Sequence, residues 1–207
     1  MKRWTAVSLV LLMLVLVGLS TCVWAPPVYW GEPIRGRVVD SASGQPLAGV
    51  VIVADWKLLA GGYGHGGHIN SLIVQETVTD SNGEFAFPEW GPKIRPSFTK
   101  LDKAPWLILF KSGYEHGALW NEQSSNGFVR RSDWDGLTVK FKRFSGTAQK
   151  RLETLDLVLS LSESQPLLLQ ELLKEEPNYP HWPGEGPLFF RHVRSLLNRG
   201  DHAKPSL

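Results

Sequence analysis

Between Ile34 and Trp90, short β-prone segments alternate with turn-forming residues, and this pattern constrains the fold more than any other feature. Residues 34–39 alternate, so Arg35 and Arg37 are expected on the face opposite Ile34 and Val38. A β-branched run follows at residues 50–53, as expected for a central strand of a sandwich.

The second half of this stretch carries the clearest turn signal. Residues 80–83 read Asp-Ser-Asn-Gly, and Asn-Gly between two β-prone segments is a strong hairpin signal. Residues 84–87 then return as a strand with Phe85 and Phe87 on one face. Further strands are expected at residues 72–79, 106–110 and 137–141. Strands of this length with frequent turns predict a β-sandwich rather than βαβ units.

Two segments inside this region are predicted to be irregular. Residues 57–70 contain the run Gly-Gly-Tyr-Gly-His-Gly-Gly-His at positions 61–68, and so much glycine favours a loop. Residues 115–135 are polar and without a clear period. The sandwich domain is therefore predicted over residues 34–144, with a long loop between two of its strands.

The pattern changes at about Ser145, where leucines begin to recur at helical spacing. Leucine and valine repeat this way over residues 152–159 and 167–173, and residues 188–199 form a last short amphipathic segment. Pro166 is placed to start the second helix, and Gly200 to stop the third. Residues 145–207 are therefore predicted to be a helical C-terminal extension that packs on the sandwich or on itself.

The N-terminal residues 1–25 have the order of a secretory signal: Lys2 and Arg3, an apolar run, then small and polar residues. Three outcomes are compatible with this segment. Cys22 follows Leu19-Ser20-Thr21, which resembles the lipobox of bacterial lipoproteins and predicts lipidation at that cysteine. Alternatively, the leader is cleaved after Ala25, or it is retained as an anchor, since it is long enough to span a bilayer at ~20 residues. Each outcome places the folded part outside the cytoplasm, and residues 26–33 read as a Pro-rich, extended spacer.

Charge and cysteine content exclude several classes of site. The 22 basic and 20 acidic residues include Lys2 and Arg3 of the leader, so the remaining chain has no charge excess. The sequence contains no basic patch of the kind that would predict nucleic-acid binding. Cys22 is the only cysteine, so the folded part contains neither a disulfide nor a thiolate metal site.

Three segments of the sandwich region together resemble a known family. They are Gly36-Arg-Val-Val-Asp40, Gly44-Gln-Pro-Leu-Ala-Gly-Val50 and Thr79-Asp-Ser-Asn-Gly-Glu-Phe85, followed by Phe110-Lys-Ser-Gly-Tyr114. This set resembles the bacterial carboxypeptidase regulatory-like domain over about residues 34–141. The resemblance implies a transthyretin-like Greek-key sandwich, without activity of its own, that serves as an accessory module in exported proteins.

Tryptophan supplies the candidate binding residues. The chain has nine, and Trp56, Trp120 and Trp134 lie in or beside predicted loops. An exposed indole can stack on the apolar face of a sugar or contact a protein partner. These three residues are therefore the predicted platforms for a carbohydrate or another ligand, and the alternative is that they pack in the core.

Candidate chemistry beyond binding is sparse. His65 and His68 lie in the glycine-rich segment and could hold Zn²⁺ or Cu²⁺ with a further ligand such as Asp55. The alternative is a solvated loop. The His-x-x-Glu, Gly-x-Ser-x-Gly and phosphate-loop patterns of enzymes are absent, and no cofactor is expected.

The sequence therefore predicts a mainly β, exported, non-catalytic accessory protein of the cell envelope, tethered to a membrane through its N-terminus or released to the periplasm. Its expected task is to bind or scaffold an envelope protein. Carbohydrate binding through the tryptophans is the alternative, and metal binding through the two histidines is a third possibility.

Overall fold

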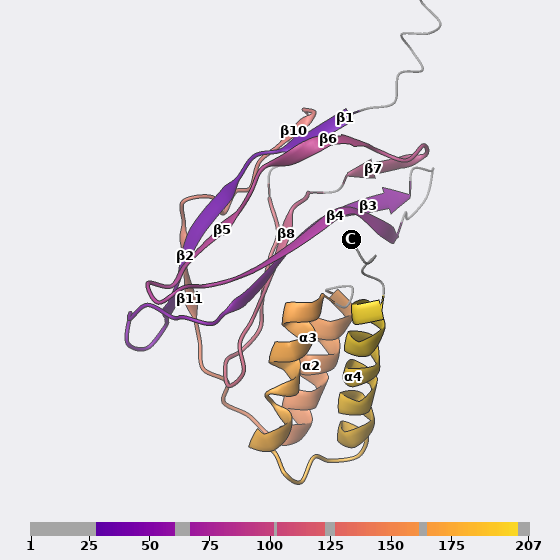
Figure 1. Cartoon of the computed structure of the whole chain (residues 1–207). Helices are drawn as coiled ribbons and strands as arrows, with labels where there is room; N and C mark the ends of the chain where they lie inside the picture. The colour runs from indigo at the N-terminus through magenta and orange to yellow at the C-terminus, as the bar shows by residue number, and fades with distance from the viewer. Residues whose placement is uncertain (1–27, 61–66, 102, 123–126, 162–164, 203–207) are drawn as a thin grey trace, which may run out of the picture.

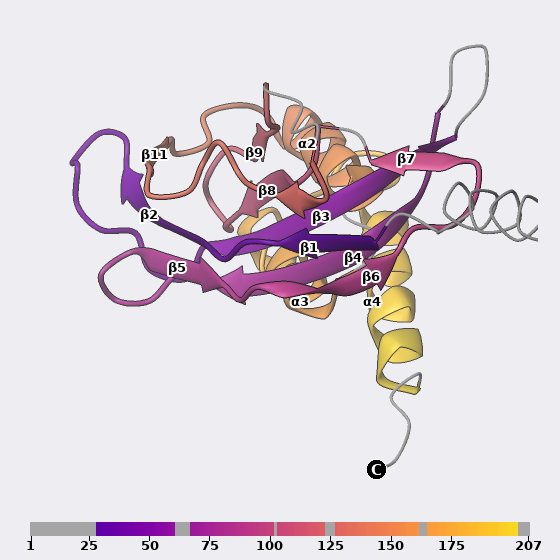
Figure 2. The ribbon, with the colours of Figure 1, turned by 90° about the horizontal axis from the view of Figure 1, so that it is seen from above.

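Two layers of β-strands and a layer of helices lie on top of one another in the computed structural model (Figure 1), which describes residues 28–60, 67–101, 103–122, 127–161 and 165–202. Seen from above, the row formed by β1 and β2 lies over β3 and β4, with the helices beneath (Figure 2). The second sheet is thus the middle layer, covered on both faces.

The first layer is a long ribbon of two three-stranded sheets that follow one another along the chain, and we call them together the first sheet. Its central row consists of β1 (Val28–Gly31) and β2 (Ile34–Asp40), separated only by Glu32 and Pro33. β5 (Glu84–Phe87) and β6 (Trp90–Ile94) pair antiparallel with this row on one side. β10 (Val129–Arg130) and β11 (Thr138–Phe141) pair parallel with it on the other side. The interpretation of residues 26–33 as a spacer is wrong for 28–31, because they form a paired strand.

The second sheet has the order β4-β3-β8-β9, and β7 also pairs with β3. Its strands are β3 (Val51–Ala60), β4 (His68–Val78), β7 (Thr99–Leu101), β8 (Trp106–Phe110) and β9 (Gly117–Leu119). β3 and β4 therefore take up much of the loop predicted over 57–70. Leu58 explains the difference: it is buried and lies between Asn70 and Leu101 in the sheet, so the glycines begin only after the strand has ended.

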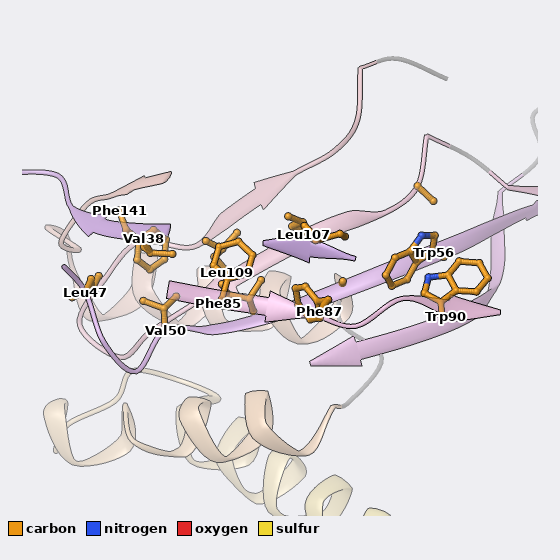
Figure 3. Close-up of a cluster of buried hydrophobic side chains, with 14 of the residues drawn as sticks. Val38, Leu47, Val50, Trp56, Phe85, Phe87, Trp90, Leu107, Leu109 and Phe141 are labelled. Carbon is orange, nitrogen blue, oxygen red and sulfur yellow. The ribbon is translucent and has the colours of Figure 1, made fainter. Parts of the chain in front are cut away.

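Alternating side chains of β3 and β8 build two separate cores. Ile52, Trp56, Leu107 and Leu109 point between the sheets, where they pack with Val38, Phe85, Phe87 and Phe141 (Figure 3). Val51, Val53, Ile108 and Phe110 point to the other face and pack against the helices. Burial on both faces explains why residues 50–53 are uniformly apolar rather than alternating.

The helical layer covers the outer face of the second sheet. It comprises α2 (Ala148–Leu161), α3 (Pro166–Leu173), the 3₁₀ turn η1 (Glu176–Asn178) and α4 (Gly186–His202). The periodic leucines supply its buried face, including Leu155, Leu168 and Leu172. Glu76 of β4 accepts the N–H groups of Leu167 and Leu168, so a sheet side chain caps the first turn of α3. The predicted mainly β sandwich with a helical C-terminal extension is confirmed.

Two residues of the turn motifs explain why the sandwich closes as it does. Asp40 lies buried at one end of the sandwich, where its Oδ1 accepts the N–H groups of Ala42 and Ser43. Its Oδ2 accepts the hydroxyl of Tyr114, from the turn after β8. Gly83 has a φ of +72°, and an added Cβ would come within 2.3 Å of the Val38 oxygen, so only glycine fits there.

Candidate functional site

Trp120 and Trp134 line a hollow of about 400 Å³, which we call the tryptophan cleft. Trp120 follows β9 at the edge of the second sheet, and Trp134 lies between β10 and β11 at the edge of the first. Glu122, Asp133 and Leu137 complete the lining. Edges of the two sheets therefore meet at this site.

Asn121 holds the two sides of the cleft together. Its buried Nδ2 donates to the carbonyl oxygens of Ala104 (3.1 Å) and Arg131 (2.8 Å), and its Oδ1 accepts the N–H of Asp133 (3.0 Å). Asp133 in turn accepts the N–H of Glu122 at 2.8 Å. These bonds fix the spacing between the loops that carry the two indoles, so the cleft is formed without a ligand.

The cleft places apolar indole surfaces beside carboxylates that can accept hydrogen bonds. The side chain of Trp120 is exposed, and its ring packs against that of Trp106 at 5.9 Å between centroids. Trp134 is half-buried, and its indole N–H donates to the Trp120 oxygen, so it contributes a face rather than a donor. Glu122 and Asp133 add carboxylates at the rim. Such a site suits a ligand with an apolar face and hydroxyl or cationic donors.

Trp56 does not belong to this site, and its assignment as a platform is wrong. It is 1% exposed and packs edge-on against Trp90 at 5.2 Å, between the two sheets (Figure 3). The reason is the alternation of β3: Trp56 has the same parity as Ile52, and both side chains point into the sandwich core.

The predicted metal site lies partly outside the described residues. His65 lies outside the described residues, and of His68 only the backbone is described, at the start of β4 opposite Leu59. Asp55, the further ligand considered, is buried and forms an ion pair with Lys57 at 2.8 Å. Among the described residues there is no group of three potential metal ligands.

The N-terminal predictions also fall outside the described part. Residues 1–27, including Cys22 and the cleavage position at Ala25, are not described, so lipidation, cleavage and retention all stay predictions. Of the helices that the structure describes, none has the length and apolar character needed to cross a membrane.

A second surface feature was not predicted from the sequence. Exposed apolar side chains lie on β1, on and next to β10, and in the lining of the cleft, and we call this set the aromatic edge. It consists of Trp30, Trp120, Phe128, Val129 and Leu137, each 43–58% exposed. Trp30 neighbours Val129 in the sheet, and Phe128 contacts the ring of Tyr29. The signal was hidden because residues 28–31 read as a spacer and 115–135 as irregular.

The helical layer is joined to the sandwich by buried charges. Arg151 of α2 donates to Glu175 at 2.6 Å and to the carbonyl oxygen of Tyr114, and both charged side chains are fully buried. Glu175 also accepts the N–H of Gly113 at 2.7 Å. The turn after β8 is thus held by side chains of the helical extension. Nearby His116 is half-buried, and burial, with a smaller contribution from Arg151, lowers its pKa below the ordinary value.

Comparisons with known proteins place few constraints on this chain. No family model matches it, and no curated protein matches its sequence. Similar solved structures include the pilus 2b backbone protein of group B streptococcus (TM-score 0.30, 14% identity, 56% of this chain and 42% of that chain). Others are the major pilin SpaD of Corynebacterium diphtheriae (0.30, 15%, 54% and 30%) and 3-chlorocatechol 1,2-dioxygenase of Rhodococcus opacus (0.31, 19%, 57% and 61%). The chain covers less than two thirds of each, and scores of this size carry no argument about function.

Proposed function

We propose that this protein is a non-catalytic accessory protein, exported to the cell envelope by its N-terminal segment, that binds an envelope protein through the aromatic edge. The observation that carries the proposal is this set of exposed aromatic and aliphatic side chains, in which Trp30 neighbours Val129 in the sheet, and Trp120 and Leu137 line one hollow. Tryptophan and phenylalanine are enriched in protein interfaces, and clustered exposed apolar residues mark binding surfaces.

The aromatic edge is also preorganised. The ring of Trp30 lies directly over Gly91, where an added Cβ would come within 2.6 Å of its Cδ1. Phe128 is held by its ring contact with Tyr29, which in turn lies under the guanidinium of Arg130 at 5.1 Å. Side chains fixed in this way lose little conformational entropy when a partner covers them, which favours binding.

The family resemblance supports the same function. Asp40 and Gly83, which belong to the motifs shared with carboxypeptidase regulatory-like domains, form turns and close the sandwich. Their chemistry is structural, as the resemblance implies for an accessory module without activity. The leader with Cys22 would bring the sandwich to the membrane surface, either by lipidation or as an anchor.

A cross-linked pull-down of the tagged full-length protein from intact cells tests the proposal. We expect one defined envelope protein with the wild type, and its loss with Trp30→Ser/Phe128→Ser. Phe98→Ser is the matched control, because Phe98 is exposed but lies between β6 and β7 and is not part of the aromatic edge. Cys22→Ala, run in parallel, asks whether the tether is needed for the partner. Equal recovery with wild type and the double variant would refute binding at this edge.

Carbohydrate binding is the second candidate, favoured by the pairing of an exposed indole with two carboxylates in the tryptophan cleft. A sugar would stack its C–H face on Trp120 and donate hydroxyl hydrogens to Glu122 or Asp133. Titration with envelope glycans should then quench tryptophan fluorescence in the wild type and in the Trp30→Ser/Phe128→Ser variant, but much less in Trp120→Ala. Quenching that is unchanged by Trp120→Ala would exclude this cleft as the sugar site.

A further inference from the structure

A groove of about 580 Å³ lies between α2 and α4, in the helical layer and not in the strand layers that carry the aromatic edge. Leu152, Leu188 and Phe189 supply its apolar surface, and Glu153, Asp156 and Glu185 its carboxylates. The groove exists because α3 packs against α4 and β3, whereas α2 packs against β8. The first halves of α2 and α4 therefore face each other across an open space.

The groove is acidic and its carboxylates are available. Among the described residues, none of Glu153, Asp156 and Glu185 takes part in an ion pair; Glu153 accepts one hydrogen bond, from Gln149 at 3.2 Å. Leu188 is 52% exposed, so the groove lining holds an exposed apolar side chain together with these carboxylates. An apolar strip beside unpaired carboxylates matches a basic amphipathic helix.

A helix of that kind is present in the chain itself. α4 contains Arg191, Arg194 and Arg199, and its one acidic residue is Asp201 near its end. Arg191 and Arg199 are exposed, and Arg194 pairs with Glu176. The groove is lined by the first half of α4, whereas Arg199 lies in its second half. Glu185 stands immediately before the helix, and the three arginines are spread along it.

We propose that the groove is occupied by α4 of a second copy, in a two-fold symmetric dimer whose two α4 helices run antiparallel. Glu185, immediately before α4, and Arg199, within it, stand seven positions before and after His192, and this heptad spacing directs them toward the same side of the helix. Antiparallel helices centred on His192 place Glu185 of each copy against Arg199 of the other. Because such an interface is self-complementary, this contact occurs twice.

The same arrangement accounts for the other groove residues. Arg191 and Arg199 of the second copy pass along α2, where Glu153 and Asp156 are the exposed acidic side chains. Leu188 of each copy becomes covered by the facing helix, beside Leu152 and Phe189. The helices α2 and α4 of both copies then form a four-helix arrangement about the two-fold axis, in which each groove is filled. With 17 residues, α4 offers a contact about 25 Å long.

Charge reversal with compensation tests the dimer directly. Sedimentation equilibrium of the purified protein should show a monomer–dimer equilibrium that weakens with added salt. Glu185→Lys and Arg199→Glu should each raise the dissociation constant about tenfold or more, because each creates two like-charge contacts. The variant that carries both changes should recover most of the lost affinity, since the exchanged charges again meet across the axis. Arg35→Glu, on the exposed outer face of β2, is the matched control and should leave dimerisation unchanged.

A cross-link at the axis tests the register. In a Cys22→Ser background, His192→Cys should form an intermolecular disulfide on mild oxidation, because the two positions face each other across the axis. Ser160→Cys, exposed near the end of α2, should not. A protein that is monomeric at all concentrations overturns the proposal. So does a dimer that ignores both reversals, a double variant no better than the singles, or a dimer without the His192→Cys cross-link. Circular dichroism of each variant separates these outcomes from misfolding.

Discussion

Replacing Arg151 with methionine should destabilise the protein far more than removal of an exposed ion pair of similar length. The guanidinium of Arg151 is fully buried, lies over the rings of Phe110 (5.3 Å) and Phe144 (4.8 Å), and donates to Glu175 at 2.6 Å. Methionine retains much of the apolar contact with the rings. It leaves the Glu175 carboxylate and the Tyr114 carbonyl oxygen without their charged donor.

The magnitude follows from burial rather than from the attraction of the pair. Breaking a buried pair by removing one partner costs about 3–5 kcal/mol, because the remaining charge stays out of water. Glu175 keeps one donor, the N–H of Gly113 at 2.7 Å, which places the expected loss near the low end, at about 3 kcal/mol. The exposed pair of Lys142 with Glu115 has an N–O distance of 2.9 Å, and Lys142→Met should cost less than about 1 kcal/mol.

Urea unfolding followed by tryptophan fluorescence gives the free energies, and a double-mutant cycle gives the coupling. Glu175→Gln keeps an acceptor for Gly113 while removing the charge. Combined with Arg151→Met, it removes both charges at once. The double variant should therefore be more stable than the sum of the two single losses predicts, by about 2 kcal/mol.

Two results would refute this reasoning. The first is an Arg151→Met loss no larger than that of Lys142→Met, which would mean that burial of the pair does not control its energy. The second is strict additivity of the Arg151→Met and Glu175→Gln losses, which would mean that the two charges act independently. Unfolding transitions that differ between fluorescence and circular dichroism would instead show that the helical layer unfolds before the sandwich. The free energies of the variants would then be compared on the transition of the helical layer.

Three further predictions concern the turns and caps. Gly83→Ala should lower the free energy of unfolding by about 2 kcal/mol or more, measured by urea unfolding, because alanine is strained at φ +72° and its Cβ meets the Val38 oxygen; no change would contradict the glycine argument. Glu76→Ala should cost about 1 kcal/mol by the same measurement, since Leu167 and Leu168 lose the acceptor that caps α3. Hydrogen bonds from the Ser43 N–H and the Tyr114 hydroxyl hold the pKa of Asp40 far below its ordinary value. Its contribution to stability is therefore present above the unfolded pKa of about 3.9 and lost as the pH falls toward the folded pKa. Thermal unfolding of Asp40→Asn should depend less on pH in this acid range than the wild type does, and identical profiles would show that Asp40 is not responsible.

The strand and turn motifs predicted the sandwich because their chemistry is local. Gly83 and the Oδ1 atom of Asp40 act on backbone groups of their own turns and of the strand next to them, so this part of their role is readable from a few neighbouring residues. The bond from the Tyr114 hydroxyl to Asp40 Oδ2 is instead a contact between distant segments. The loop predicted from residue 57 begins later in the structure, because the glycines come only after Leu58 and Leu59. The strand continues through these two residues because core contacts, not local propensity, decide its length.

The candidate site was only partly predictable. Trp120 and Trp134 were named as platforms, and they do line one cleft, but their meeting depends on Asn121, which joins loops ten residues apart through buried hydrogen bonds. Trp56 was misassigned because its exposure depends on strand parity and on a facing sheet. Trp30 was not predicted as a surface residue, because the four-residue strand that carries it forms only by pairing with β6 and β10, which lie far along the chain.

The sequence by itself determined the mainly β class, the helical extension and the positions of the tight turns, because periodicity and turn chemistry act over a few residues. Only the tertiary structure decided which aromatic side chains are buried, how Arg151 and Glu175 join the helices to the sandwich, and where the aromatic edge and the acidic groove lie. These features depend on contacts between segments that are distant in the chain, and solvent exposure is a property of the packed layers rather than of any single residue.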